Sequence, residues 1–317
     1  MEMQSYKPTM QPASSFLLLM GLWLVCFVAG GLLVVPVWYA LTGESIFEMQ
    51  KGMMNPKNID AMKIAQLVST FFMFFLPAYI TARIVSEKPL NYLGYRGGLK
   101  LNRIAVAILL MLAVLPFVAW LADVNKAIPV SAAMKKVFEN FESQYEEQIK
   151  LLAQFRSPLD YISALLIIAL MPANVEETFF LGALQNILKK WIVNPHIAIF
   201  TTSVIFSVIH FSYYGFLPRI ALGMMLGYIF YVTGNLWYSI IGHFFNNALM
   251  VTILYVQYLK DKTIDTKVGE SAPWWAAFIS LVLIITLFIQ LKRMVATKVH
   301  ADSIAEHAAE QDRSHQA

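Results

Sequence analysis

The chain has 317 residues, of which 58% are hydrophobic and 14% charged, and its formal net charge is +4. A soluble domain is about half apolar and about a quarter charged, so this composition argues against a soluble protein. The basic residues form no stripe with interleaved aromatic side chains, which argues against nucleic-acid binding. A single cysteine, Cys26, excludes an internal disulfide and a cysteine-based zinc site.

The apolar residues gather in runs that predict membrane-spanning helices, since crossing a ~30 Å hydrocarbon core takes about 20 helical residues. Eight such runs lie at 16–41, 64–85, 104–122, 161–188, 197–211, 216–232, 236–259 and 274–291. The first run is followed by no small-residue cleavage site, so we expect a retained span and not a signal peptide. The predicted fold is an all-α, polytopic transmembrane helix bundle that forms one membrane-embedded domain over residues 16–298.

Three loop segments that eight spans would place on one side of the membrane are rich in basic residues. They contain Arg83, Lys88, Arg96, Lys100, Arg103, Lys189, Lys190, Lys292, Arg293 and Lys298. The positive-inside rule assigns that side to the cytoplasm, together with both termini. We therefore expect a cytoplasmic segment at 1–15 and a polar, disordered tail at 299–317, and we expect the basic loops to contact anionic membrane lipids.

The segment 131–156, between the third and fourth runs, is different in kind. Apolar residues recur in it at steps of three and four, and charged residues fill the other face, which predicts an amphipathic helix too polar to span the membrane. Two interpretations are open. The helix lies at the membrane interface or packs against the bundle, or it forms a lid over a cavity.

Strongly polar side chains at membrane depth are costly, so each one is a candidate for function. The segment 172–182 contains Pro172 and the adjacent acids Glu176 and Glu177. Neighbours on a helix point about 100° apart, so one acid is expected to face a cavity and the other to be structural. A buried carboxylate can act as a general base. Alternatively, the pair stabilises the start of a helix after Pro172.

Two later runs contain a histidine with a partner at helical spacing. Phe206 and His210 are four residues apart, as are His243 and Asn247, and Asn246 lies near the face of the second pair. Each pair alone is compatible with ordinary packing of helices through hydrogen bonds.

Taken together, the polar residues suggest hydrolysis. A glutamate and a histidine can activate a water molecule, while a histidine and an asparagine can stabilise a tetrahedral oxyanion. Glu176, His210 and His243 could also bind a divalent metal such as zinc. The sequence contains neither a His-Glu-x-x-His motif nor a Gly-x-Ser-x-Gly motif.

The three segments, in this order, resemble the CPBP family of intramembrane proteases. This family includes the type II CAAX prenyl endopeptidases and the Abi proteins linked to bacteriocin immunity, and its pattern is Glu-Glu-x-x-x-Arg, Phe-x-x-x-His and His-x-x-x-Asn/Asp. The resemblance covers about 169–249, within a protease-like core at about 159–259. It implies that Glu176 and His210 activate water, that His243 and Asn247 stabilise the oxyanion, and that Glu177 and Phe206 support them. Metal use, as a metalloprotease, stays open.

One position departs from this pattern, because Leu181 stands where the family has arginine. That arginine would lie within ion-pair reach of Glu177. An acid that loses a buried partner must protonate or find another donor. We therefore expect Glu177 to be neutral or to bind a different donor.

The sequence thus favours an intramembrane endopeptidase that cleaves a membrane-associated protein or peptide, including prenylated ones, in a bacterial cytoplasmic membrane. A second hypothesis is a non-catalytic protein of the same family that acts in bacteriocin self-immunity or as a scaffold. A third is a transporter or proton relay, which requires polar side chains strung along a path instead of converging on one cavity.

Overall fold

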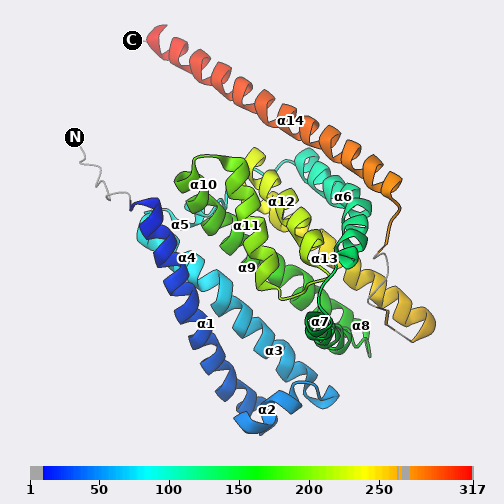
Figure 1. Cartoon of the computed structure of the whole chain (residues 1–317). Helices are drawn as coiled ribbons and strands as arrows, with labels where there is room; N and C mark the ends of the chain where they lie inside the picture. Colours follow the sequence, from blue (N-terminus) through cyan, green and yellow to red (C-terminus); the bar gives the residue numbers. More distant parts are fainter. Residues whose placement is uncertain (1–9, 263, 266–270, 316–317) are drawn as a thin grey trace.

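The structure is a computed structural model that describes residues 10–262, 264–265 and 271–315, with side chains described as far as residue 297. Within these residues every regular element is helical (Figure 1). The α-helices are α1 Pro12–Thr42, α2 Ile46–Gly52, α3 Ile59–Thr70, α4 Leu76–Val85, α5 Pro89–Tyr92, α6 Leu101–Ala127, α7 Ala132–Leu152, α8 Pro158–Ala164, α9 Met171–Glu177, α10 Asn186–Ile192, α11 Pro195–Ile209, α12 Phe216–Thr233, α13 Leu236–Asp261 and α14 Trp274–His315. The predicted all-α bundle is confirmed.

Among the described residues, 7 helices are long and apolar enough to cross a membrane. They are Pro12–Thr42, Pro56–Val85, Leu101–Ala127, Pro158–Ile192, Phe216–Thr233, Leu236–Asp261 and Trp274–Thr297. The remaining predicted span is α11, which has only 15 residues. At 1.5 Å per residue it is about 22 Å long, shorter than a ~30 Å hydrocarbon core. Seven long helices and one short helix therefore take the place of the eight predicted spans.

Three stretches of π-helix interrupt the second and fourth spans, η2 Phe71–Phe75, η3 Leu165–Leu170 and η4 Thr178–Gln185. Two of them end just before Pro77 and Pro172. Proline has no N–H for the carbonyl four residues earlier and its ring collides with that carbonyl, so the preceding turn opens. The π-segments η3 and η4 flank α9, which holds both predicted acids.

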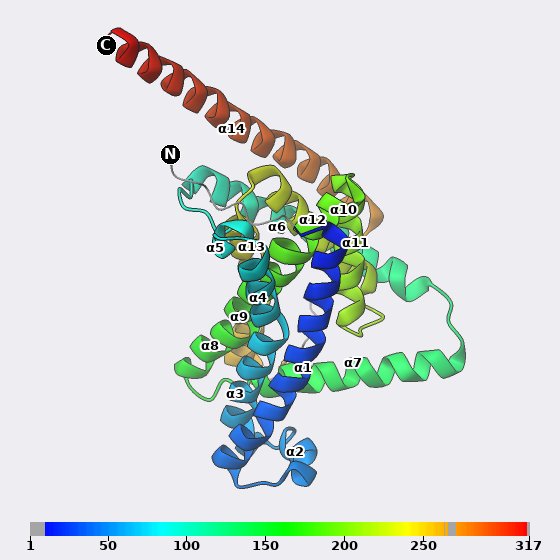
Figure 2. The same ribbon diagram turned by 90° about the vertical axis from the view of Figure 1, so that its left-hand side faces the viewer.

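The basic loops meet at one end of the bundle. Side chains bond across them: Asn186 Nδ2 donates to the Tyr92 carbonyl at 3.2 Å and Asn235 Nδ2 to the Arg96 carbonyl at 2.9 Å. Arg103 Nη2 donates to the Met294 carbonyl at 2.8 Å. The start of α1 and the far end of α14 lie at this same end (Figures 1 and 2). This arrangement agrees with an even number of crossings, and its assignment to the cytoplasm stays a prediction.

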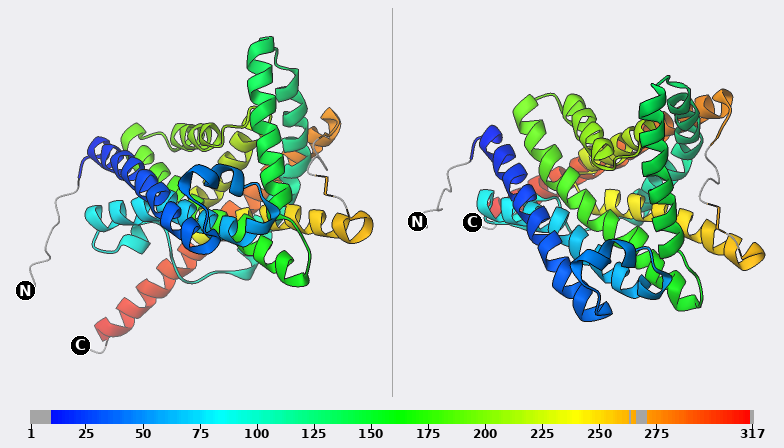
Figure 3. Two further views of the ribbon diagram at one scale, coloured as in Figure 1. Left: turned by 90° about the horizontal axis from the view of Figure 1, so that it is seen from below. Right: turned by 60° about the horizontal axis from the view of Figure 1, so that its bottom comes forward.

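The helix α7 matches the predicted amphipathic segment and lies across the opposite end of the bundle (Figure 2). Views from below show it crossing over the ends of the spanning helices (Figure 3). The final helix, α14, continues through 299–315, where the sequence favours a disordered tail. That segment is rich in alanine and glutamate, which are strong helix formers.

Helix α12 packs closely against α11 and against η4. A Cβ atom at Gly223 would lie 3.1 Å from Ser203 Cβ, and one at Gly227 would lie 2.6 Å from Gln185 Oε1. Small residues at such crossings let helix backbones approach closely in a membrane.

Candidate active site

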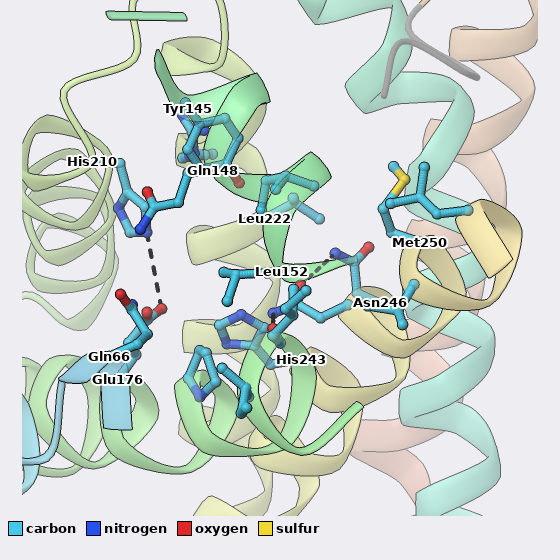
Figure 4. Close-up of a pocket in the computed structure, with 18 of the residues that line it drawn as sticks. Gln66, Tyr145, Gln148, Leu152, Glu176, His210, Leu222, His243, Asn246 and Met250 are labelled. Atoms are coloured by element: carbon cyan, nitrogen blue, oxygen red, sulfur yellow. Dashed lines mark hydrogen bonds and ion pairs between the residues drawn. The ribbon is translucent and has the colours of Figure 1, made fainter. Parts of the chain in front are cut away.

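A cavity of about 380 Å³ lies between α3, α7, α9, α11, α12 and α13 (Figure 4). This volume is within the range of small-molecule sites, roughly 300–1,000 Å³. Its polar lining residues are Gln66, Glu142, Tyr145, Glu146, Gln148, Glu176, His210, Arg219, His243, Asn246 and Asn247. The four residues predicted to be catalytic, which are far apart in the sequence, therefore line one cavity.

Glu176 and His210 face each other across part of this cavity (Figure 4). Glu176 Oε2 lies 4.0 Å from His210 Nε2, which is too long for a direct hydrogen bond. His210 Nδ1 lies 2.7 Å from the Phe206 carbonyl oxygen. Because a carbonyl only accepts, Nδ1 carries the proton and Nε2 of the neutral ring is an acceptor. Two acceptors thus face each other at a separation that one water molecule can bridge.

Glu177 forms a second and separate pair with His243. His243 Nδ1 donates to Glu177 Oε1 at 2.7 Å, and both side chains are at least nine-tenths buried. A carboxylate at one ring nitrogen fixes the orientation of the imidazole and leaves the other nitrogen for the cavity. Glu177 therefore acts on the cavity through His243, since it does not itself line the cavity.

The two adjacent acids point in different directions because they lie at different angles around the axis of α9. Successive residues on a helix point about 100° apart. Glu176 points into the cavity, while Glu177 points toward α13 and is only 3% exposed. The division into one cavity-facing and one structural acid follows from this offset.

Asn247 is held in place by a carbonyl of the fourth span. Its Nδ2 donates to the Ile168 carbonyl at 3.3 Å, and its Oδ1 accepts from Asn246 Nδ2 at 3.3 Å. Ile168 lies four residues before Pro172, which has no N–H to bond that carbonyl. The proline thus leaves an acceptor that positions Asn247, whose second amide N–H is available to the cavity.

Phe206 lies between the two histidines. Its ring centroid is 4.5 Å from that of His210 and 6.4 Å from that of His243, the latter edge to face. The ring of Phe180 packs against the ring of Phe206, with 5.0 Å between their centroids. The supporting role predicted for Phe206 corresponds here to an apolar spacer that sets the distance between the two imidazoles.

Leu181 is buried in an apolar cluster with Leu226, Phe230 and Leu236, where a lone arginine would lack a partner. Glu177 does not need that arginine, because His243 is its donor. The expectation that Glu177 finds another donor agrees with this bond. The residue after Glu177, Thr178, hydrogen-bonds to Tyr95 Oη at 2.5 Å and ties the start of η4 to the basic end of the bundle.

A metal site is not preformed in the described part of the chain. No three histidine, cysteine, aspartate or glutamate side chains there cluster closely enough to hold a metal ion. Glu176 with His210 and Glu177 with His243 form two pairs, not one ligand set. In this arrangement the side chains of Glu176, His210 and His243 do not form one zinc ligand set. Zinc binding by these residues stays a prediction.

Sequence reasoning missed Arg219, Gln66 and the cavity-lining residues of α7. The signal for Arg219 was present, since it is a charged residue inside the sixth apolar run. Gln66 and the polar face of α7 gave no comparable signal, because Gln66 lies near the start of the run 64–85 and every amphipathic helix has a polar face. The contact of α7 with the cavity favours the lid interpretation of this helix.

The family comparison agrees with this geometry. Residues 158–249 match the family model described as type II CAAX prenyl endopeptidase Rce1-like. Comparisons with curated proteins and with solved structures gave no significant match. The matched segment runs from the start of α8 into α13 and contains all four predicted catalytic residues. The segment 158–249 is therefore similar to the Rce1-like type II CAAX prenyl endopeptidases, in agreement with the resemblance of its polar motifs.

Proposed function

We propose that this protein is an intramembrane endopeptidase that hydrolyses a peptide bond of a membrane-associated protein or peptide. One observation carries the proposal: Glu176 and His210 face each other at 4.0 Å in a cavity that also holds His243 and Asn247. The family is one of proteases, which is consistent with this chemistry.

The nucleophile in this mechanism is a water molecule between Glu176 and His210. The water donates one hydrogen bond to the Glu176 carboxylate and one to His210 Nε2. The other ring nitrogen, Nδ1, is already bonded to the Phe206 carbonyl. Attack on the scissile carbonyl passes one proton to this pair. The same pair later returns the proton to the leaving amine, as general acid catalysis requires.

The oxyanion is stabilised by His243 and Asn247. His243 donates to the oxyanion through Nε2–H when its ring is doubly protonated, and the Glu177 carboxylate at Nδ1 then balances the charge of the ring. The free N–H of Asn247 is the second donor. In a water-poor cavity these hydrogen bonds are stronger than in bulk water.

The substrate class follows from the position of the cavity between membrane-spanning helices. A peptide reaches it only if it is held at the membrane, as a prenyl group or an apolar segment would hold it. Among the lining residues, Leu152, Leu222 and Met250 offer apolar surface for such a segment.

A second candidate function is that of a non-catalytic protein of this family, which acts in bacteriocin self-immunity or as a scaffold. The leucine at position 181, where the family has arginine, favours it. A proton relay gains no support, because all four polar residues line one cavity. If the protein acts as a scaffold, its cellular phenotype survives the substitution Glu176→Ala.

The test is peptide cleavage in proteoliposomes by the wild type, Glu176→Gln and His210→Ala, with a library of fluorescent peptides as substrate. Loss of a general base is expected to slow cleavage by about 10²- to 10⁴-fold. His196→Ala is the matched control, since His196 is exposed and bonds Tyr228 outside the cavity. Equal cleavage by all four proteins, or by none, would overturn the proposal.

A further inference from the structure

One cation in the cavity has no role in the mechanism above. Arg219, in the first turn of α12, is the only lysine or arginine among the described residues that line the cavity. Its Nη1 is fully buried and has no hydrogen-bond partner. Leaving a charged donor buried without an acceptor is unfavourable, so a ligand that supplies an acceptor would be bound there.

The backbone that carries Arg219 is firmly fixed. Asn125 of α6 clamps the preceding loop, since its Nδ2 donates to the Tyr213 carbonyl at 2.7 Å and its Oδ1 accepts from Leu217 N at 3.1 Å. Ser207 Oγ donates to the Phe216 carbonyl at 2.8 Å. A donor held by such a scaffold loses little freedom when a ligand binds.

The guanidinium is also held in place. It packs over Gly215, where a Cβ atom would collide with Nη1, and its Cζ lies 5.9 Å from the centre of the Tyr145 ring. Arginine stacks on aromatic rings while its edge stays available for hydrogen bonds. Gly215 and Tyr145 therefore fix the plane of Arg219 between the loop after His210 and α7.

The acids nearest in the lining have other partners. Glu142 accepts from Ser212 Oγ at 2.9 Å, Glu146 pairs with Lys150 at 3.9 Å, and Glu176 faces His210. Arg219 lines the same cavity as Glu176 and His210, which places it near the reacting atoms.

We propose that Arg219 is a specificity-determining residue that binds a carboxylate of the peptide substrate in the same cavity as the scissile bond. The guanidinium matches a carboxylate because both are planar and form two parallel hydrogen bonds. The carboxylate is either the C-terminus of the peptide or an acidic side chain. This inference rests on the proposed function for its substrate, yet the binding it describes can be measured without cleavage.

The experiment uses three libraries of fluorescent octapeptides: one with a free C-terminal carboxylate, one with a C-terminal amide, and one with aspartate as the last residue and a C-terminal amide. Binding is measured by fluorescence anisotropy on Glu176→Gln protein in detergent micelles, and cleavage on protein with Glu176 intact. Arg219→Met and Arg219→Lys are compared in both backgrounds. Arg156→Met is the matched control, because Arg156 is exposed and lies outside the cavity.

With Arg219 present, binding of at least one carboxylate library is expected to exceed binding of the amide library about 10- to 100-fold, the range of charge-assisted hydrogen bonds. Arg219→Met is expected to abolish this preference while binding of the amide library changes little, and Arg219→Lys retains part of it. Preference for the free acid alone identifies the C-terminus, and equal preference for the aspartate library identifies an acidic side chain.

An unchanged preference in Arg219→Met, or an equal loss of binding for acid and amide, would overturn the inference and leave Arg219 as a structural counter-charge. If Arg219→Met does not fold, Gly215→Ala displaces the guanidinium and must lower the same preference. Binding that depends on Arg219 without cleavage of any library would refute the proposed function and leave the carboxylate site standing.

Discussion

Glu177 and His243, 66 residues apart in the sequence, are joined by a buried 2.7 Å hydrogen bond between a carboxylate oxygen and Nδ1. This bond orients the imidazole that lines the cavity and replaces the ion pair that an arginine at position 181 would form. The two consecutive acids thus have separate histidine partners, Glu176 with His210 and Glu177 with His243.

Replacement of Glu177 by alanine is expected to lower both activity and stability. His243 would lose its orienting partner, which costs metal and catalytic histidines about 10- to 100-fold in activity. An unpaired buried donor costs about 1–3 kcal/mol of unfolding free energy. Cleavage assays and thermal unfolding in detergent measure the two effects. Glu176→Gln is the contrasting variant, expected to lose activity at unchanged stability, and identical behaviour of the two would contradict these roles.

The contact between Asn247 and the Ile168 carbonyl predicts an effect of Pro172 on catalysis. In Pro172→Ala a backbone N–H becomes available to that carbonyl and competes with the Asn247 amide. We expect slower cleavage with an unchanged or higher melting temperature, because the helix gains a bond. Pro77→Ala, which alters the same kind of π-segment away from the cavity, is the control. A similar loss of activity in both variants would show a general effect of helix geometry.

Introduction of the family arginine, Leu181→Arg, is expected to destabilise this chain. Leu181 is 3% exposed among apolar side chains, and an unpaired buried charge costs about 3–5 kcal/mol. Leu181→Met, which conserves volume, should cost less than about 1.5 kcal/mol. Thermal unfolding in detergent compares the two. A Leu181→Arg protein as stable as the wild type would indicate that the new arginine reaches Glu177.

Metal removal distinguishes a metal-free mechanism from a metal-dependent one. Because the described acids and histidines form two pairs instead of one ligand set, we expect cleavage to persist after treatment with a chelator such as 1,10-phenanthroline. Elemental analysis of the purified protein accompanies the assay. Loss of activity that added zinc restores would show that Glu176, His210 and His243 come together around a metal in the active protein.

The sequence alone determined which long apolar segments are helices and which polar residues are out of place in them. The reason is that a bilayer requires every backbone polar group to be bonded within its own segment, so about 20 apolar residues already specify a helix. Spacing of four residues likewise placed Phe206 with His210 and His243 with Asn247 on common faces.

Only the tertiary structure decided how these faces meet. The pairing of Glu177 with His243, the link from Asn247 to the carbonyl freed by Pro172, the short length of α11 and the position of α7 on the cavity all depend on how deep each helix lies and how it is rotated. Local periodicity sets neither quantity, because both arise from packing between residues far apart in the sequence. The same reason explains why Arg219 could be noticed as a charge in an apolar run, while its place beside the catalytic residues required the assembled bundle.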